Sequence, residues 1–127
     1  MIEAYFESVE KTIQAFPHVR SYTLTKKVYS AKQGFIRGII LFDDDTRLEF
    51  VEVKDADVSE KIKYRYQYMD KDHTMIFRYD NAPHHPHIPT FPHHKHVDEE
   101  DMKESHEPTL DDVLLEIAQR MRLQEQE

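Results

Sequence analysis

Histidine is the residue type of this chain best suited to proton transfer, and most of its histidines lie in one short segment. Residues 82–96 read A-P-H-H-P-H-I-P-T-F-P-H-H-K-H and hold six of the nine histidines and four of the six prolines. The imidazole ring gives or takes a proton near neutral pH, and in its neutral form it also binds metal ions. The segment is therefore a candidate for a catalytic site, a metal site or a solvated strap.

The four prolines of this segment recur at every third position, which is the period of a polyproline II helix. Because residues in that conformation rise about 3.1 Å each, Pro83 and Pro92 are expected about 28 Å apart along an extended strap. That length is close to the full width of a domain of this size. Phe91 is the apolar side chain expected to anchor the strap on the domain.

The same geometry disfavours a metal site. Histidines three positions apart are separated by about 9 Å on an ideal strap, whereas the ligands of one zinc ion all lie about 2.1 Å from it. Only a bend after Pro92 lets His93 and His96 approach each other, with Asp80 as a further ligand. We therefore predict no metal site and no cofactor, and expect adventitious metal binding by a histidine-rich surface instead.

Cleavage of a phosphodiester requires a general base, a general acid and a cation near the developing negative charge. The candidate catalytic residues are the histidines that follow Phe91, namely His93, His94 and His96. The candidate substrate-binding residues are Arg65, Arg78 and Lys95 for phosphate, and Tyr68 for stacking on a base.

Simpler interpretations stay open for the same residue types. Within residues 61–69, one face of the predicted strand carries Ile62, Tyr64, Tyr66 and Tyr68, which is most simply the packed face of a sheet. The two arginines fit surface ion pairs equally well. The histidines at positions 84, 85 and 87 fit exposed strap residues, and those at positions 18, 73 and 106 are expected to be solvated.

The hydrophobic pattern predicts an α+β fold to position these residues. Apolar residues at three- and four-residue spacing predict an N-terminal helix over residues 2–16, which Pro17 ends. Alternation between positions 19 and 79 then predicts about five strands, mainly antiparallel and joined by short turns. The last two strands, 61–69 and 73–79, form a hairpin that places Arg65 and Arg78 near the same part of the sheet.

A C-terminal helix follows an acidic stretch. Thr109 and Asp112 have the spacing of a capping box, which predicts that the helix begins there. We therefore predict a single domain over residues 1–127. Its parts are a helix-plus-sheet core (1–80), the extended Pro/His strap (81–97), an acidic linker (98–108) and the C-terminal helix (109–124).

Composition limits the classes of function. The net charge of −8 lies entirely in residues 97–127, which hold eleven acidic and three basic residues, so residues 1–96 are balanced and can meet a phosphate backbone locally. The chain has no cysteine, no run of 18 apolar residues and no apparent signal peptide, so we expect a cytoplasmic protein without a membrane span. With two glycines it has no glycine-rich phosphate loop.

Three stretches of the chain carry a family resemblance. Residues 64–70 (Y-R-Y-Q-Y-M-D), 77–86 (F-R-Y-D-N-A-P-H-H-P) and 89–97 (P-T-F-P-H-H-K-H-V) together resemble the TumE-type family of small prokaryotic proteins. The members of that family are the toxin components of toxin–antitoxin modules. The resemblance implies a toxin that interferes with RNA or translation and is neutralised by a cognate DNA-binding antitoxin of the helix-turn-helix type. It carries over no catalytic residues.

These observations lead to one main hypothesis and two alternatives. The main hypothesis is a cytoplasmic toxin that acts on RNA as a metal-independent endoribonuclease, with histidines as acid and base and arginines as phosphate contacts. The first alternative is a non-enzymatic interaction module with a structural Pro/His strap, and the second is a metal-dependent hydrolase. Association into a homodimer stays open.

Overall fold

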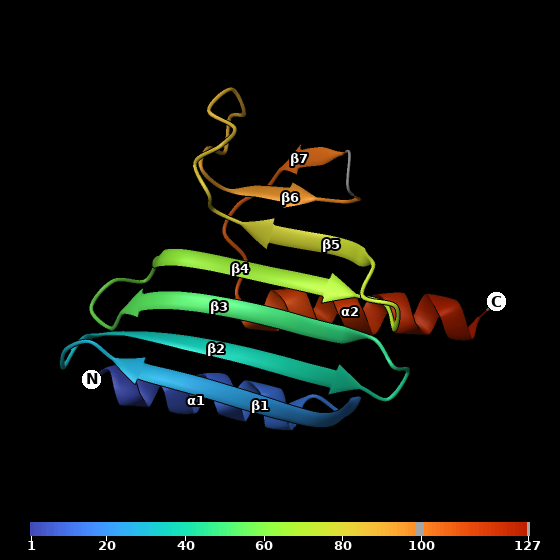
Figure 1. The fold of residues 1–127 in the computed structure, drawn as a ribbon, viewed down its shortest axis with the longest axis horizontal. Helices are drawn as coiled ribbons and strands as arrows, with labels where there is room; N and C mark the ends of the chain where they lie inside the picture. Colours follow the sequence, from blue (N-terminus) through green and yellow to red (C-terminus); the bar gives the residue numbers. More distant parts are fainter. Residues whose placement is uncertain (99–100, 127) are drawn as a thin grey trace.

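The computed structural model describes residues 1–98 and 101–126 as two helices and one antiparallel sheet. The helices are α1 (Ile2–Ala15) and α2 (Leu110–Glu125). The strands are β1 (Val19–Val28), β2 (Gln33–Phe42), β3 (Arg47–Asp55), β4 (Lys61–Met69), β5 (Met75–Asp80), β6 (His94–His96) and β7 (Met102–Glu104). The strands lie in sequence order, and both helices cover the same face of the sheet (Figure 1). We call the other face the open face.

The predicted α+β class is confirmed, but the predicted number of strands is wrong. The sheet has seven strands among the described residues because β6 and β7 extend it beyond β5. Each of these two strands is three residues long, which is too short to show an alternating hydrophobic pattern. β6 lies in the predicted strap, and β7 lies in the predicted acidic linker, of which Glu99 and Glu100 fall outside the described residues.

The core lies between the helices and the sheet. The apolar stripe of α1 is buried through Ile2, Phe6, Val9 and Ile13, and that of α2 is buried through Leu110, Val113, Leu114, Ile117 and Met121. The capping box at the start of α2 is confirmed, since Thr109 and Asp112 each accept a hydrogen bond from the other's backbone N–H. No helix of the described residues is long and apolar enough to cross a membrane.

Gly38 allows the sheet to pack closely in the core. It pairs with Phe50 of β3, and a Cβ atom at Gly38 would lie 2.2 Å from Cε1 of the Phe50 ring. The aromatic ring therefore occupies the space that any larger residue at position 38 would need.

The predicted alternation of β4 is correct for the tyrosines and wrong at the start of the strand. The side chains of Tyr64, Tyr66 and Tyr68 are buried on the helix side, but Ile62 is 56% exposed and Lys61 is buried. The register between β3 and β4 shifts at this point, where Val53 pairs with Lys63 and Lys54 pairs with Lys61. Such an irregularity moves the following side chains to the other face.

The extended polyproline strap is not confirmed. Residues 83–92 form successive bends and turns, in which the backbone N–H groups of Ile88, Phe91 and His93 each donate to a carbonyl three residues earlier. A polyproline II helix has no such internal hydrogen bonds. The expected anchor, Phe91, is 44% exposed.

A candidate histidine site on the open face

The end of β5 and the whole of β6 position the candidate site. In the pairing of these two strands, Asp80 lies opposite His94 and Arg78 lies opposite His96. Side chains directly opposite each other in a sheet point to the same face. Because Phe77 and Tyr79 point into the core, these four side chains share the open face.

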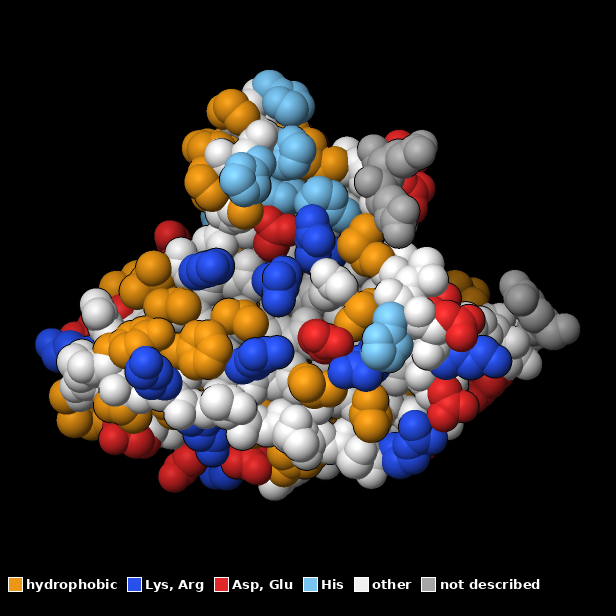
Figure 2. Space-filling model, in the orientation of Figure 1, with side chains coloured by type: hydrophobic (Ala, Val, Ile, Leu, Met, Phe, Trp, Pro, Cys, Tyr) orange, Lys and Arg blue, Asp and Glu red, His pale blue; other side chains and the backbone are white. Residues whose placement is uncertain are grey.

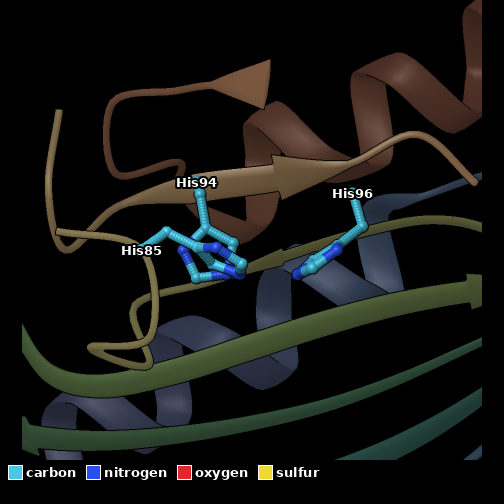
Figure 3. A group of neighbouring side chains, drawn as sticks. All are labelled: His85, His94 and His96. Atoms are coloured by element: carbon cyan, nitrogen blue, oxygen red, sulfur yellow. The ribbon is translucent and has the colours of Figure 1, made fainter. Parts of the chain in front are cut away.

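Three imidazole rings meet at this position, and we call them the three-histidine cluster. His85 comes from the turn segment, and His94 and His96 come from β6 (Figure 3). One nitrogen from each ring lies within 4.8 Å of those of the other two. The ring centroids are 4.9 Å apart for His94 and His96, 5.0 Å for His85 and His94, and 6.0 Å for His85 and His96.

The cluster contradicts the expectation that the histidines stay apart. That expectation assumed an extended strap, whereas the turns fold His85 back onto β6. The sequence indicates that His85 is an exposed strap residue, so it does not predict His85 as a site residue. The turns bring His85 to the cluster, and the period of the prolines does not predict them.

Asp80 contacts the cluster from the end of β5. Its buried carboxylate accepts hydrogen bonds from Nε of Arg78 at 3.1 Å and from the backbone N–H of Ala82 at 3.0 Å, and it lies 2.8 Å from Nε2 of His94. Nε2 of His96 lies 3.6 Å from the same carboxylate. One carboxylate therefore holds the arginine and the start of the turn segment by hydrogen bonds and lies beside two of the histidines.

His94 is the most constrained ring of the three. Its side chain is 2% exposed, with Nδ1 lying 3.0 Å from the carbonyl oxygen of Pro92 and Nε2 facing Asp80. Both ring nitrogens thus face oxygen atoms. His94 is better placed to support its neighbours than to touch a substrate.

His85 and His96 are the two rings of the cluster that reach solvent. Burial lowers the pKa of His96, and the Arg78 guanidinium lowers it further against the opposing charge of Asp80. Burial also lowers the pKa of His85, and the neighbouring histidines lower it further. Both rings are therefore unprotonated at neutral pH more often than an ordinary histidine, and their lone pairs are available.

A hollow of about 340 Å³ lies on the open face beside the cluster. It is lined by Gln67, His73, Met75, Arg78 and His96. Its volume falls within the range of about 300–1,000 Å³ that is usual for sites of small ligands. His73, which we expected to be solvated only, is thus a second histidine at this hollow, and Nη1 of Arg47 lies 3.3 Å from its Nε2.

Arg65 adds a second cation to the same face. It pairs with Asp80 across β4 and β5, while Arg78 pairs with Gln67, so both arginines occupy neighbouring positions as the hairpin predicted. Among the described residues no carboxylate forms an ion pair with the exposed Arg65. Figure 2 shows Lys and Arg side chains directly adjacent to the group of histidines.

The other predicted site residues lie on the helix side of the sheet. His93 stacks on the ring of Tyr64, whose hydroxyl lies 2.9 Å from its Nδ1. Lys95 donates to Glu116 of α2 at 2.8 Å. Tyr68 is buried and donates to Oγ1 of Thr46. The structure therefore brings together His94, His96, Arg65 and Arg78, and it places His93, Lys95 and Tyr68 elsewhere.

Comparison with known families gives one match. The family described as Toxin TumE matches residues 9–121, which is most of the chain. Neither the curated proteins nor the solved structures contain a match.

Proposed function

The chain belongs to the TumE toxin family, and from this premise we propose that it is a toxin that cleaves RNA at the three-histidine cluster. The observation that carries the proposal is the position of the cluster. Two imidazoles that reach solvent lie on the same face of the sheet as two arginines, and neither helix of the described residues covers that face. This is the set of groups that metal-independent phosphodiester cleavage requires.

Arg78 and Arg65 supply the phosphate contacts in this proposal. Arg78 lines the hollow together with His96, and its Nε is fixed by Asp80, so its guanidinium is held in place beside the histidine. Arg65 lies two pairing positions away on the same face and extends the positive charge along the sheet. Guanidinium groups bind phosphate oxygens in pairs and stabilise the charge that develops during cleavage.

His96 and His85 perform the proton transfers. Unprotonated His96 takes the proton from the ribose 2′-hydroxyl, whose oxygen then forms a bond to phosphorus. The bond between phosphorus and the 5′-oxygen breaks, and protonated His85 gives its proton to that oxygen. Repulsion among neighbouring imidazoles disfavours protonation of both rings at once, which suits a pair that works as one acid and one base.

His94 and Asp80 have a positioning role. The buried Asp80–His94 pair holds β6 against β5 and sets the place of the two reacting rings. Neither side chain needs to touch RNA, because both are more than nine-tenths buried.

A toxin family also implies an antitoxin partner. We propose a helix-turn-helix DNA-binding protein in that role, on the family resemblance noted for residues 64–97. Co-purification of such a protein from a strain that carries the neighbouring gene is the expected result. Recovery of an antitoxin of another class would contradict this part of the proposal.

The test is cleavage of a defined RNA by the purified chain in the presence of EDTA. Replacement of an acid or base slows such a reaction by about 10²–10⁴-fold, and we expect that loss in His96→Ala and in His85→Ala. His84→Ala is the matched control, since His84 lies in the same segment, is exposed and is outside the cluster. It should cleave at the wild-type rate.

Two outcomes oppose the proposal. Full activity in both cluster variants would contradict the acid and base roles of His85 and His96. Absence of cleavage by the wild-type chain on any RNA would favour the non-enzymatic interaction module instead.

A further inference from the structure

We propose that the three-histidine cluster is a zinc site through which Zn²⁺ inhibits the toxin. The ligands are one nitrogen each from His85, His94 and His96. The metal site itself depends only on the geometry of these rings. Its inhibitory effect rests on the proposed function, because it requires that the same rings carry out the cleavage.

The spacing of the three rings is close to that of a zinc site. Zinc lies about 2.0–2.1 Å from histidine nitrogens, so two ligands of a tetrahedral site are about 3.3 Å apart. The three nitrogens of the cluster already lie within 4.8 Å of one another. With the nitrogen of His94 fixed, those of His85 and His96 each need to move by no more than about 1.5 Å to complete the site.

The two rings that have to move are the ones free to do so. His85 lies in the turn segment and His96 is partly exposed, whereas His94 is held by Pro92 and Asp80. Figure 3 shows the three rings turned toward one another from the loop and from β6. The ring of His94 thus stays in place while the rings of His85 and His96 move toward it.

Asp80 makes the position favourable for a cation. Its carboxylate lies 2.8 Å from Nε2 of His94 and 3.6 Å from Nε2 of His96. The negative charge of this buried carboxylate attracts a cation to the cluster.

The ligand type selects the metal. Three imidazole nitrogens suit zinc and similar transition metals, whereas magnesium and calcium prefer oxygen ligands. When Zn²⁺ is bound, neither ring can exchange a proton with RNA, and cleavage stops.

The first experiment is a calorimetric titration of the EDTA-treated, dialysed chain with Zn²⁺ alone. We expect one strong site per chain. His96→Ala and His85→Ala should each weaken it at least about tenfold, the lower limit for disturbing even the outer contacts of a metal site. Because both side chains reach solvent, these variants should keep the fold, which circular dichroism checks. His84→Ala should bind as the wild type does.

Some titration results would overturn the metal site. These are absence of a strong site, unchanged affinity in the cluster variants, or an equal loss of affinity in His84→Ala. The last result would indicate adventitious binding along the histidine-rich segment.

The second experiment measures RNA cleavage at increasing occupancy of this site. We expect inhibition to follow the occupancy and EDTA to reverse it. Unchanged or increased cleavage at full occupancy would overturn the inhibitory effect. A chain that binds one zinc ion but cleaves no RNA overturns the proposed function and supports the metal site. A chain that cleaves RNA but has no zinc site overturns the metal site and leaves the proposed function supported.

Discussion

Replacement of Asp80 by asparagine tests the centre of the candidate site. Asparagine has the same shape, and its carbonyl oxygen can still face Nε2 of His94 and the backbone N–H of Ala82. Its amide nitrogen then faces Nε of Arg78, where two donors oppose each other. The change removes the hydrogen bond from Arg78, and it weakens the one from Ala82 and the contact with His94.

The structure sets the size of the effect on the free energy of unfolding. A hydrogen bond to a charged group contributes about 1.5–3 kcal/mol and a neutral one about 0.5–1.5 kcal/mol, so each weakened bond costs about 1 kcal/mol. The lost bond to Arg78 contributes less than the full amount, because the Arg78 side chain is 32% exposed. We expect Asp80→Asn to lower the unfolding free energy by about 2–3 kcal/mol, which corresponds to a decrease of about 6–15 °C in Tm.

Urea unfolding followed by far-ultraviolet circular dichroism measures this change. The chain has no tryptophan, so fluorescence is a weak probe of its core. The slope of the unfolding free energy against urea concentration should stay the same, since unfolding exposes the same surface area in the variant and in the wild type. Asp72→Asn is the control because Asp72 is exposed, and its effect should stay within about 0.5 kcal/mol.

One result would refute the reasoning about Asp80. If Asp80→Asn unfolds within about 0.5 kcal/mol of the wild type, the carboxylate does not hold His94 and Arg78 as the structure places them. A larger loss in Asp80→Ala than in Asp80→Asn is also expected, since alanine leaves Nε2 of the buried His94 without the oxygen that it now faces.

Three further predictions concern the fold. Gly38→Ala should lower the unfolding free energy by about 1–3 kcal/mol in urea, because the new Cβ overlaps the ring of Phe50, and an unchanged stability would contradict that packing. Burial raises the pKa of Glu116, but hydrogen bonds from Lys95 and Tyr79 have the larger combined effect and lower it. The Glu116 carboxylate therefore stabilises the fold above its unfolded pKa of about 4.5. This stabilisation is lost as the pH falls through the lower pKa of the folded state. In acid titrations Glu116→Gln should therefore lose less stability than the wild type, and equal losses would oppose the assignment. Burial and the Glu52 charge raise the pKa of Tyr66, so its contribution to the stability of the fold is complete below the ordinary tyrosine pKa of about 10 and is lost above it. Phenolate absorbance should show that the buried tyrosines ionise only when the chain unfolds. Ionisation of all seven tyrosines in the folded chain would contradict this prediction.

The sequence was sufficient for the elements that have long repeating patterns. The stripes of both helices, the capping box at Thr109 and the hairpin that brings Arg65 beside Arg78 all follow from local spacing. Side-chain alternation in β4 was also readable, except where the register shift exposes Ile62. These features depend on neighbours close in the chain.

The histidine cluster depends on contacts that no local pattern shows. A proline at every third position leaves two N–H groups between successive prolines, and here these donors close turns at Ile88, Phe91 and His93. The turns bring His85 back over β6, and β6 itself is recognisable only from its pairing with β5. The period of the prolines predicted a polyproline II helix, but the backbone hydrogen bonds form turns instead.

The side chains of β6 show how pairing separates candidates that are adjacent in sequence. His94 and His96 point to the open face, whereas Lys95 between them points to the helices and contacts Glu116. Once β6 is recognised as a strand, its alternation explains why only part of the H-H-K-H stretch belongs to the site.

The chemical ends of the cleaved RNA test the central claim most directly. Attack by the 2′-hydroxyl, with His96 and His85 as base and acid, leaves a 2′,3′-cyclic phosphate on one fragment and a 5′-hydroxyl on the other. It also leaves DNA of the same sequence intact, because DNA has no 2′-hydroxyl. Mass spectrometry of the products formed in EDTA should show the cyclic phosphate. Fragments with a 3′-hydroxyl and a 5′-phosphate, or cleavage that requires added metal, would contradict the account.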